Sequence, residues 1–553
     1  MPEYLAPAVY VEETSFRAKS IEGVSTSTTG FVGPTLTGPS GGTPELLTSF
    51  ADFERIYGGL DPLSYGTNYL AHSVRAYFNE GGSRLYVSRV VTTSADAGFA
   101  SAAIGASGHS FVARFPGRGG NGTITVSAMQ RTASPIALDR APTGSVFVTN
   151  DAIPVTHLKG ASGWAPALPN TPAGDLVTLS IRTRDGAGRE VTYEDVGLDP
   201  QHPRWIGSVL SETPTRLSET IQRQFAVHFT GTTPPAGGDL KSALGTLPQT
   251  FTLTGGLDGD APNTAQYEAA LAALAAIEDI SIIAAPGSST YGTTTGPGVR
   301  NALITSAEKR RAYRVAVLDT PEGFGLSQVR EWRGQIDSKY AALYFPWVVV
   351  ANPLARAGDD SIPKEIALPP SGFISGIYAR NDVQRGVFKA PANEVVNSAL
   401  RFETDVNFAQ QEVLNPLGIN CLRFFPGRGY RVWGARTASS DPEWKYLNIR
   451  RYFNFLERSI DVGTQWAVFE PNGERLWVNI RETIGSFLET QWRSGALLGG
   501  DPKQAFFVRC DRSTMTQDDL DNGRLICLVG VAAVKPAEFV IFRIGQKTAD
   551  ARS

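Results

Sequence analysis

The middle of the chain, residues 251–395, alternates short apolar runs with segments in which apolar residues recur every three or four positions. Apolar runs of this length predict strands buried on both faces, and the wider spacing predicts amphipathic helices. The strands are expected at 279–285, 313–318 and 340–350. The helices are expected at 264–277, with Thr264 as N-terminal cap, at 297–311 and at 326–336. Buried strands that alternate with helices indicate a parallel α/β sheet.

Residues 29–95 show the same alternation and are predicted to form the first part of this α/β core. Leu70, Val74 and Tyr77 share one face of the second of two expected helices. The expected strands are 29–33 and 84–90, and the expected helices are 46–57 and 69–79.

Residues 96–250 interrupt the core with a segment dense in Gly, Ser, Thr, Pro and Ala. Short strand patterns recur here, separated by turn signals such as Asp185-Gly186-Ala187-Gly188. The strands are expected at 123–126, 146–149, 176–182 and 190–193. We interpret this segment as a β-rich insertion, exposed and tolerant of variation.

Residues 396–535 predict a C-terminal α+β domain. Asp441 followed by Pro442 is typical of a helix start, and the helix is expected to run to about residue 460. A second helix is expected at 474–493, and strands at 506–510 and 524–531.

The two ends of the chain, 1–28 and 536–553, are predicted to be extended arms. Val9-Tyr10-Val11 is a short strand pattern, and 539–544 is an apolar strand in which Arg543 is the only charge. An exposed strand of this kind is an aggregation hazard unless it is covered. It is covered either by strand addition between copies of the protein or by pairing of the two termini within one chain, and the pattern favours neither.

The charge is nearly balanced, with 51 Lys and Arg against 54 Asp and Glu and a net charge of −3. Such a balance disfavours a protein that binds nucleic acid mainly through phosphates, and it suits one that packs against itself. The N-terminus lacks the basic region and the apolar region that a secretory signal has. The longest uncharged apolar stretch, 340–351, is too short to cross a bilayer. We therefore expect a soluble protein made in the cytoplasm.

None of the cofactor-binding or metal-binding motifs considered is complete in this sequence. There is no Gly-Lys dipeptide, so a P-loop is excluded. The GxGxxG match at 117–122 precedes a strand pattern where a dinucleotide site needs a helix, so a hairpin turn is favoured. The acidic run 518–523 has Leu520 at the third ligand position of an EF-hand and therefore does not fit calcium. Cys421, Cys510 and Cys527 are expected to be buried free thiols.

The histidines argue against hydrolytic catalysis. None occurs in the last 325 residues, so the core and the C-terminal domain lack the imidazole of a Ser-His-Asp arrangement. The five histidines are His72, His109, His157, His202 and His228. No two lie close enough in sequence for a compact zinc site, and satisfied polar or surface roles are favoured for each. We expect no catalytic residue, no metal and no cofactor.

Several stretches resemble the contractile tail sheath family of phage tails, R-type tailocins and phage-tail-like injection systems. The N-terminal match is 4–13 with 21–27, in which Ala8 stands where the family usually has Gly. The other matches are Asp279–Gly287, Tyr340–Trp347, Pro369–Gly372, Gly376–Arg380, Lys389–Glu394, Val432–Thr437, Asp521–Leu525 and Val534–Phe539. The resemblance covers about 1–95 and 251–545 and is weak over the insertion.

The resemblance implies a structural protein with a subtilisin-like α/β core that is not proteolytic. Family subunits form stacked six-fold rings around an inner tube, with the C-terminal domain inside and the insertion outside. Terminal arms of neighbouring subunits add strands to a sheet of the C-terminal domain. The linking strands implied here are Val9, Tyr10, Val11 and Glu12, and Phe539, Val540, Ile541, Phe542, Arg543 and Ile544.

The resemblance further implies contraction without a nucleotide, from a metastable extended state to a more tightly packed one, triggered by a baseplate. The implied partners are other copies of the chain, the tube protein, the baseplate and terminal cap proteins. Arg481, Glu482, Glu489 and Arg493 are candidates for tube contact, against the alternative that this face meets another subunit or solvent. A subtilisin-like hydrolase and a non-contractile shell protein are the alternative functions.

Overall fold

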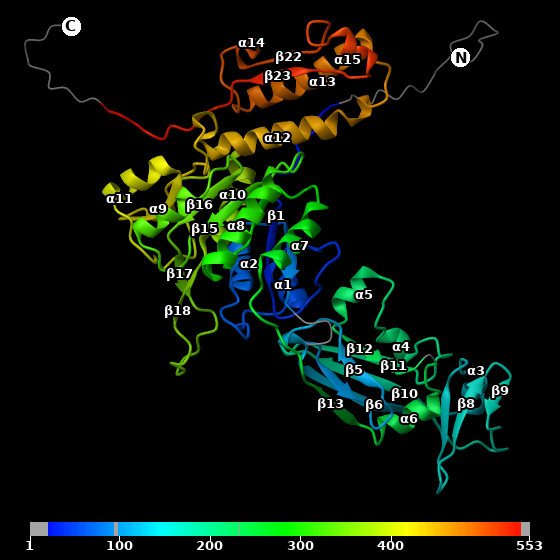
Figure 1. Ribbon diagram of the computed structural model, residues 1–553. Helices are drawn as coiled ribbons and strands as arrows, with labels where there is room; N and C mark the ends of the chain where they lie inside the picture. The colour runs from blue at the N-terminus through cyan, green and yellow to red at the C-terminus, as the bar shows by residue number, and fades with distance from the viewer. Residues whose placement is uncertain (1–19, 93–97, 232, 543–553) are drawn as a thin grey trace, which may run out of the picture. The chain divides into compact units, whose positions relative to one another are not determined.

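The computed structural model describes residues 20–92, 98–231 and 233–542 (Figure 1). These residues form two units. The larger unit contains residues 26–384 and 391–445, and the smaller unit contains 20–25, 385–390 and 446–542.

A mainly parallel sheet forms the centre of the larger unit. Within the described residues, its eight strands lie in the order β2-β3-β1-β14-β15-β16-β20-β21. All neighbours from β3 to β20 are parallel, and the short edge strands β2 and β21 are antiparallel. The strands are β1 (Thr29–Pro34), β2 (Leu46–Leu47), β3 (Leu85–Val90), β14 (Ile282–Ala284), β15 (Val315–Asp319), β16 (Ala341–Phe345), β20 (Ile419–Phe425) and β21 (Gly429–Val432). Strands β1, β14, β15 and β16 are buried throughout, which explains their uninterrupted apolar sequences.

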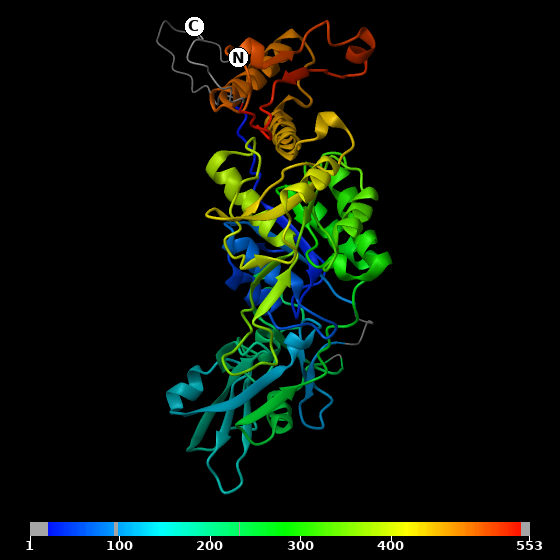
Figure 2. The same cartoon turned by 90° about the vertical axis from the view of Figure 1, so that its left-hand side faces the viewer.

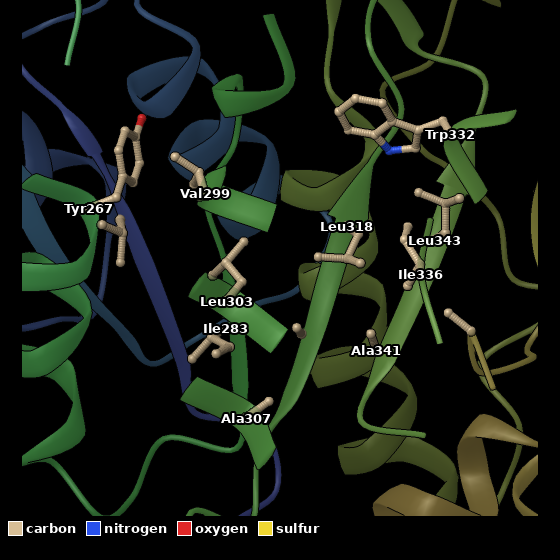
Figure 3. Packing of buried hydrophobic residues seen from close by; sticks show 14 of the residues in the cluster. Tyr267, Ile283, Val299, Leu303, Ala307, Leu318, Trp332, Ile336, Ala341 and Leu343 are labelled. Carbon is tan, nitrogen blue, oxygen red and sulfur yellow. The ribbon is translucent and has the colours of Figure 1, made fainter. Parts of the chain in front are cut away.

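Helices cover both faces of this sheet. On one face, apolar side chains of α7, α8 and α9 pack against Ile283, Leu318 and Leu343 (Figure 3). Side chains alternate along a strand, so the neighbouring residues point to the other face, where Phe31 packs on Tyr77 of α2. The helices of the core are α1 (Phe50–Tyr57), α2 (Tyr69–Asn79), α7 (Thr264–Ala275), α8 (Gly292–Glu308), α9 (Leu326–Gly334), α10 (Pro370–Arg385) and α11 (Phe408–Leu414).

Two glycines of α10 allow it to approach α2 closely. A Cβ added at Gly372 would lie 2.7 Å from the Cβ of Ser73, and one added at Gly376 would lie 2.5 Å from the carbonyl oxygen of Tyr77. The two glycines are four residues apart and therefore share one helix face. Only glycine fits this contact without a shift of one helix.

Several element boundaries of the core differ from the sequence prediction. The run 340–350 is two strands in two sheets, because Pro346 cannot donate to a ladder and separates β16 from β17 (Val348–Ala351). Asn263, not Thr264, caps α7 in a capping box. The predicted helix 46–57 begins with β2 and becomes helical only at Phe50. Helix α8 begins at Gly292, ahead of Pro297.

Strand β17 pairs on either side with β18 (Glu365–Leu368) and β19 (Arg401–Phe402). Strands β20 and β21 belong to the central sheet, although the sequence pattern assigned them to the C-terminal domain.

The insertion contains two antiparallel sheets, drawn from light blue through cyan to green in Figures 1 and 2. In the described part, one has the order β13-β6-β10-β7-β8-β9 with β11 on β10, and the other has the order β12-β5-β4. Its strands are β4 (Ser101–Ala103), β5 (Ser110–Ala113), β6 (Gly122–Thr132), β7 (Val146–Thr149), β8 (Thr156–Gly160), β9 (Gly163–Ala165), β10 (Gly174–Arg184), β11 (Glu190–Val196), β12 (Phe225–His228) and β13 (Gln249–Leu253). Short helices connect them: α3 (Pro135–Arg140), α4 (Ile206–Val209), α5 (Leu217–Gln222) and α6 (Gly237–Leu244). The insertion has its own apolar core, to which Phe111, Ile181 and Phe251 contribute.

The smaller unit packs two long helices and a strand hairpin around one apolar cluster. Its elements are α12 (Leu447–Gly463), α13 (Glu474–Arg493), α14 (Pro502–Ala505), β22 (Phe506–Arg509), α15 (Gln517–Asp521) and β23 (Leu528–Val531). The helix expected from Asp441 is instead a 3-10 turn, Pro442–Trp444, followed by α12. Strand β23 begins at Leu528, later than the predicted 524.

Candidate functional site

The C-terminal run Phe539–Phe542 directly follows a segment that is hydrogen-bonded to the rest of the smaller unit. Asn448 of α12 donates to the carbonyl of Val534 at 3.3 Å, and the Tyr446 hydroxyl donates to the carboxylate of Glu538 at 3.1 Å. The four side chains that follow are 69%, 69%, 79% and 82% exposed. Burying an apolar side chain of this size contributes about 1.5–3 kcal/mol, so the run is an apolar surface suited to a partner.

The predicted strand over 539–544 is not formed in its described part, Phe539–Phe542. The other predicted linking residues, Val9, Tyr10, Val11, Glu12, Arg543 and Ile544, lie outside the described residues. The assignment of these ten residues as linking strands therefore stays a prediction.

Strands β22 and β23 form an antiparallel hairpin, here called the C-terminal hairpin, with register Phe506↔Val531 to Arg509↔Leu528. Phe506, Val508 and Val531 pack against the apolar cluster that α12 and α13 share. An isolated hairpin is marginal in water, so this packing holds it in place. In the described part of the chain no third strand pairs with it, and each outer edge is open to strand addition.

The four candidate tube-contact residues on α13 do not form one cluster. Glu489 and Arg493 form an ion pair of 2.6 Å on the exposed face, and Glu482 is exposed as well. Arg481 instead lies toward the end of the C-terminal hairpin. The Ser513 hydroxyl and amide lower the pKa of Asp511, and the charge of Arg481 lowers it further. Tube contact by these residues stays a prediction.

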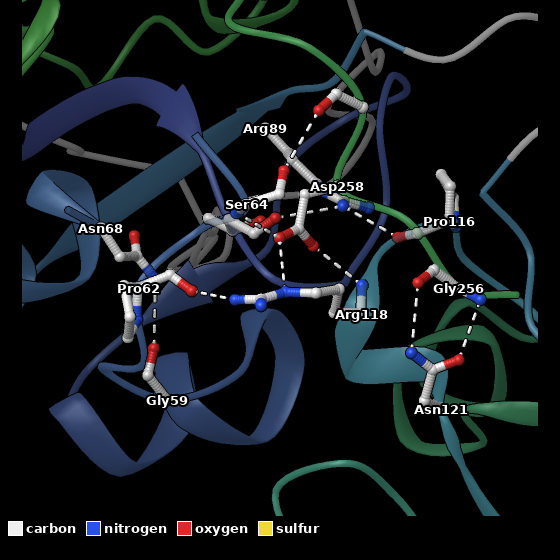
Figure 4. Close-up of polar contacts among 12 residues, drawn as sticks. Gly59, Pro62, Ser64, Asn68, Arg89, Pro116, Arg118, Asn121, Gly256 and Asp258 are labelled. Atoms are coloured by element: carbon white, nitrogen blue, oxygen red, sulfur yellow. Dashed lines mark hydrogen bonds and ion pairs between the residues drawn. The ribbon is translucent and has the colours of Figure 1, made fainter. Parts of the chain in front are cut away.

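A buried carboxylate joins the insertion to the core (Figure 4). Asp258, whose side chain is 1% exposed, accepts from the amide of Arg118 at 2.8 Å, from its Nε at 2.9 Å and from the amide of Ser64 at 3.0 Å. Arg118 also donates to the carbonyl of Pro62. Asp258 thus connects a loop of the core to the 3-10 turn Arg118–Gly120, which precedes β6 of the insertion.

Arg89 completes this junction from β3. Its guanidinium donates to the carbonyls of Gly38 at 2.7 Å, Pro116 at 2.8 Å and Thr35 at 3.1 Å. Burial lowers the pKa of Arg89 to about 10, while the charge of Asp258 acts in the opposite direction and favours the protonated form. We name Arg89, Arg118 and Asp258 the insertion joint. Sequence reasoning missed it, and the only signal was an acid within the glycine-rich stretch 255–259.

A buried carboxylate and a serine meet at the end of β15. Asp319 Oδ1 accepts from the amide of Ser371 at 2.7 Å, and Oδ2 is 2.6 Å from its hydroxyl. Burial raises the pKa of Asp319 to about 7, and the bonds from Ser371 oppose that shift. Ser371 occupies both carboxylate oxygens and is itself fully buried, so the pair caps α10 and does not orient a nucleophile.

His72 and the acidic residue Asp519 take part in packing and in an ion pair, respectively. His72 is buried in α2, and burial lowers its pKa to about 4. Asp519 lies in the N-terminal turn of α15 and pairs with Arg524 at 2.9 Å. Over residues 20–92, 98–231 and 233–542 no group of three or more His, Cys, Asp or Glu is placed to hold a metal ion. Nor does any helix among them combine the length and apolarity needed to cross a bilayer.

The larger unit is thus an α/β core with a β insertion, and the smaller unit carries a two-stranded hairpin and an exposed apolar terminal run. The family model for the phage tail sheath central domain matches residues 260–438, and that for the phage tail sheath C-terminal domain matches 439–547. The chain belongs to the phage tail sheath family. It is therefore a structural protein and not an enzyme.

Individual relatives agree with this assignment. A putative prophage major tail sheath protein of Pseudomonas aeruginosa is 25% identical over 269 residues, 48% of this chain and 64% of the relative. The chain spans less than two thirds of the length of the curated relatives it matches.

Two solved structures share the fold over nearly the whole chain. The helical sheath of the anti-feeding prophage in its contracted state matches with a TM-score of 0.57 and 22% identity, over 99% of this chain and 100% of that one. The sheath complex of an extracellular contractile injection system in its contracted state matches with a TM-score of 0.55 and 21% identity, over 99% of each chain.

Proposed function

We propose that this chain is the sheath subunit of a contractile injection system. It polymerises as stacked hexameric rings around an inner tube and contracts to drive the tube through a target envelope. Family membership and the likeness to two sheaths in their contracted state support this proposal. The core is proposed to keep the subtilisin-like arrangement without its chemistry, in agreement with the use of Ser371 as a helix cap.

The observation that carries the proposal is that one unit contains both the exposed run Phe539–Phe542 and a hairpin to which no third described strand is paired. We propose that this run and the N-terminal strand around Val9–Val11 each add to the C-terminal hairpin of a neighbouring subunit. Strand addition supplies backbone hydrogen bonds, and alternate side chains enter the partner's apolar surface. Phe507 and Leu528, which are each 50% exposed and share one face of the hairpin, are the apolar surface beside which such a strand would lie.

Contraction then draws on contacts between subunits. The extended sheath is held behind a kinetic barrier, and triggering at the baseplate releases it to a state with more buried surface. The other proposed partners are the tube protein and the terminal cap. We assign tube contact to Glu482, Glu489 and Arg493, with Arg481 closer to the hairpin. The particle is assembled in the bacterial cytoplasm and acts there or after release.

Truncation of the C-terminal run tests the proposal. Residues 536–553 are deleted in one variant, and only the polar tail 546–553 is deleted in a matched control. A third variant lacks residues 1–15. We expect the control to form striated tubes or short, wide cylinders in negative-stain micrographs, and both arm deletions to leave folded subunits without sheaths.

Normal contractile sheaths from the 536–553 deletion would show that the arm argument is wrong. Sheaths of the full chain that never shorten when triggered would favour a non-contractile shell, and persistent monomers that cleave peptides would favour a hydrolase.

A further inference from the structure

Two cysteines of the smaller unit are opposed at the loop end of the C-terminal hairpin, where residues 510–527 connect its two strands. The last register pair of the ladder is Arg509↔Leu528, so one further step places Cys510 opposite Cys527. Directly opposed residues of antiparallel strands have Cα atoms about 4.5–5.5 Å apart. This spacing falls inside the roughly 4.4–6.8 Å that a disulfide spans.

Contacts on the other side of the pair hold the two thiols together. The Thr514 hydroxyl lies 2.9 Å from the carbonyl of Asp511 and 2.8 Å from the carbonyl of Ile526, the residues that follow Cys510 and precede Cys527. The ladder and this hydroxyl therefore fix the pair from both directions. Each thiol also lies close enough to the other to shift its pKa.

We propose that Cys510 and Cys527 are a disulfide-forming pair that closes the end of the C-terminal hairpin when the protein meets a low-molecular-weight disulfide. Both thiols are free in the structure. Cys527 is partly exposed and Cys510 is buried, so Cys527 reacts first and Cys510 resolves the intermediate.

The chemistry balances with oxidised glutathione as the oxidant. The Cys527 thiolate attacks one glutathione sulfur, a protein–glutathione disulfide forms, and one glutathione thiolate leaves. The Cys510 thiolate then attacks the Cys527 sulfur, the protein disulfide forms, and the second glutathione leaves. The pair loses two electrons and two protons, which reappear in two molecules of reduced glutathione.

The surroundings make the pair slow to react, not inert. Burial raises the pKa of Cys527 to about 12, with Cys510 raising it further and Arg481 lowering it. Burial also raises the pKa of Cys510. Thiolate is the reactive form, so the reduced pair withstands brief exposure to a mild oxidant and requires a sustained one.

Mass spectrometry of the full chain after sustained incubation with oxidised glutathione tests this proposal. We expect the native protein to lose the mass of two hydrogen atoms, without intermediate adducts. Cleavage after Arg and Lys should yield peptide 510–512 linked to peptide 525–543, because Lys535 precedes Pro536 and is not cut. Cys421, buried in β20, should remain alkylatable after unfolding.

Serine variants separate the proposed steps. In Cys510→Ser the glutathione adduct on Cys527 should accumulate, because the resolving thiol is gone, and Cys421→Ser should behave as the wild type. Accumulation of the same adduct in the wild type, cross-linking between chains, or no mass change after sustained exposure would overturn the proposal. Formation of the Cys510–Cys527 disulfide can be measured independently of sheath assembly. Only its effect on strand addition rests on the proposed function, and micrographs of the oxidised protein report that separately.

Discussion

Removal of the Asp258 carboxylate should loosen the attachment of the insertion to the core. Asp258→Ala deletes three hydrogen bonds of 2.8–3.0 Å made by a side chain that is 1% exposed. It also removes the negative charge that favours the protonated form of buried Arg89. Breaking a buried charge pair costs about 3–5 kcal/mol. Arg118 is 42% exposed and regains water, so we take the lower limit, about 3 kcal/mol.

Hydrogen exchange followed by mass spectrometry measures this change where it occurs. The amide of Gly117 donates to the carbonyl of Gly98 at 2.8 Å and does not contact Asp258, so it reports opening of the joint. About 3 kcal/mol corresponds to an opening constant raised roughly 150-fold. Asp258→Asn, which keeps one acceptor oxygen and loses the charge, should give an intermediate rise.

Glu365→Gln is the matched control. Its pair with Arg401, at 3.0 Å, has side chains that are 46% and 55% exposed, and exposed pairs contribute about 0–1 kcal/mol. We expect little change in exchange around residues 98–121 in this variant. If Asp258→Ala exchanges in this region no faster than the control does, the joint is not what holds the insertion.

Three further predictions follow from the larger unit and from helix α13. Since burial raises the pKa of Asp319 from 3.8 to about 7, its contribution to stability is full below pH 3.8 and is lost progressively as pH rises from 3.8 to about 7. Asp319→Asn can keep both bonds to Ser371, so the variant should melt near the wild type at pH 4 and clearly above it at pH 8, the shift corresponding to at most roughly 4 kcal/mol. Equal pH dependence of Tm in the two proteins would contradict the burial argument. Gly376→Ala should destabilise by about 1–3 kcal/mol in urea unfolding, because its Cβ would lie 2.5 Å from a backbone oxygen. Gly485→Ala on α13 has open space around the added Cβ and should stabilise by up to about 1 kcal/mol, so a shared sign for the two variants would refute the packing account.

The sequence pattern predicted best those elements in which each face of the strand or helix has a single kind of environment, either apolar or polar. Strand β15 is buried on both faces, and α2 and α13 each have one apolar face, so their patterns are unambiguous and their predicted bounds lie close to the observed ones. The run 340–350 is apolar on both sides of Pro346, and hydrophobicity alone does not record that its halves belong to different sheets.

The functional contacts were harder to predict because they join distant residues. Asp258 and Arg118 are 140 positions apart, and each alone resembles an ordinary surface charge. Cys510 and Cys527 were expected to be buried free thiols, and Cys527 is instead partly exposed. Their opposition was not predicted, because it depends on a hairpin whose loop contains a helix of its own. The exposed run Phe539–Phe542 was visible as an apolar pattern, but its partner is not encoded in its own residues.

The two chain segments that connect the insertion to the core run next to each other. Thr92 is bridged to Gly259, and Gly98 to Gly256, so the two crossings lie within one strand spacing of each other. A Cβ at Gly259 would lie 1.8 Å from the carbonyl of Thr92, which shows how closely they pass. Both bridges are parallel, so a connection that replaces the insertion has to turn back on itself and needs a linker longer than a tight turn. The closeness of the two crossings still makes this position a natural graft point, at which a foreign domain with neighbouring termini could be displayed on the subunit.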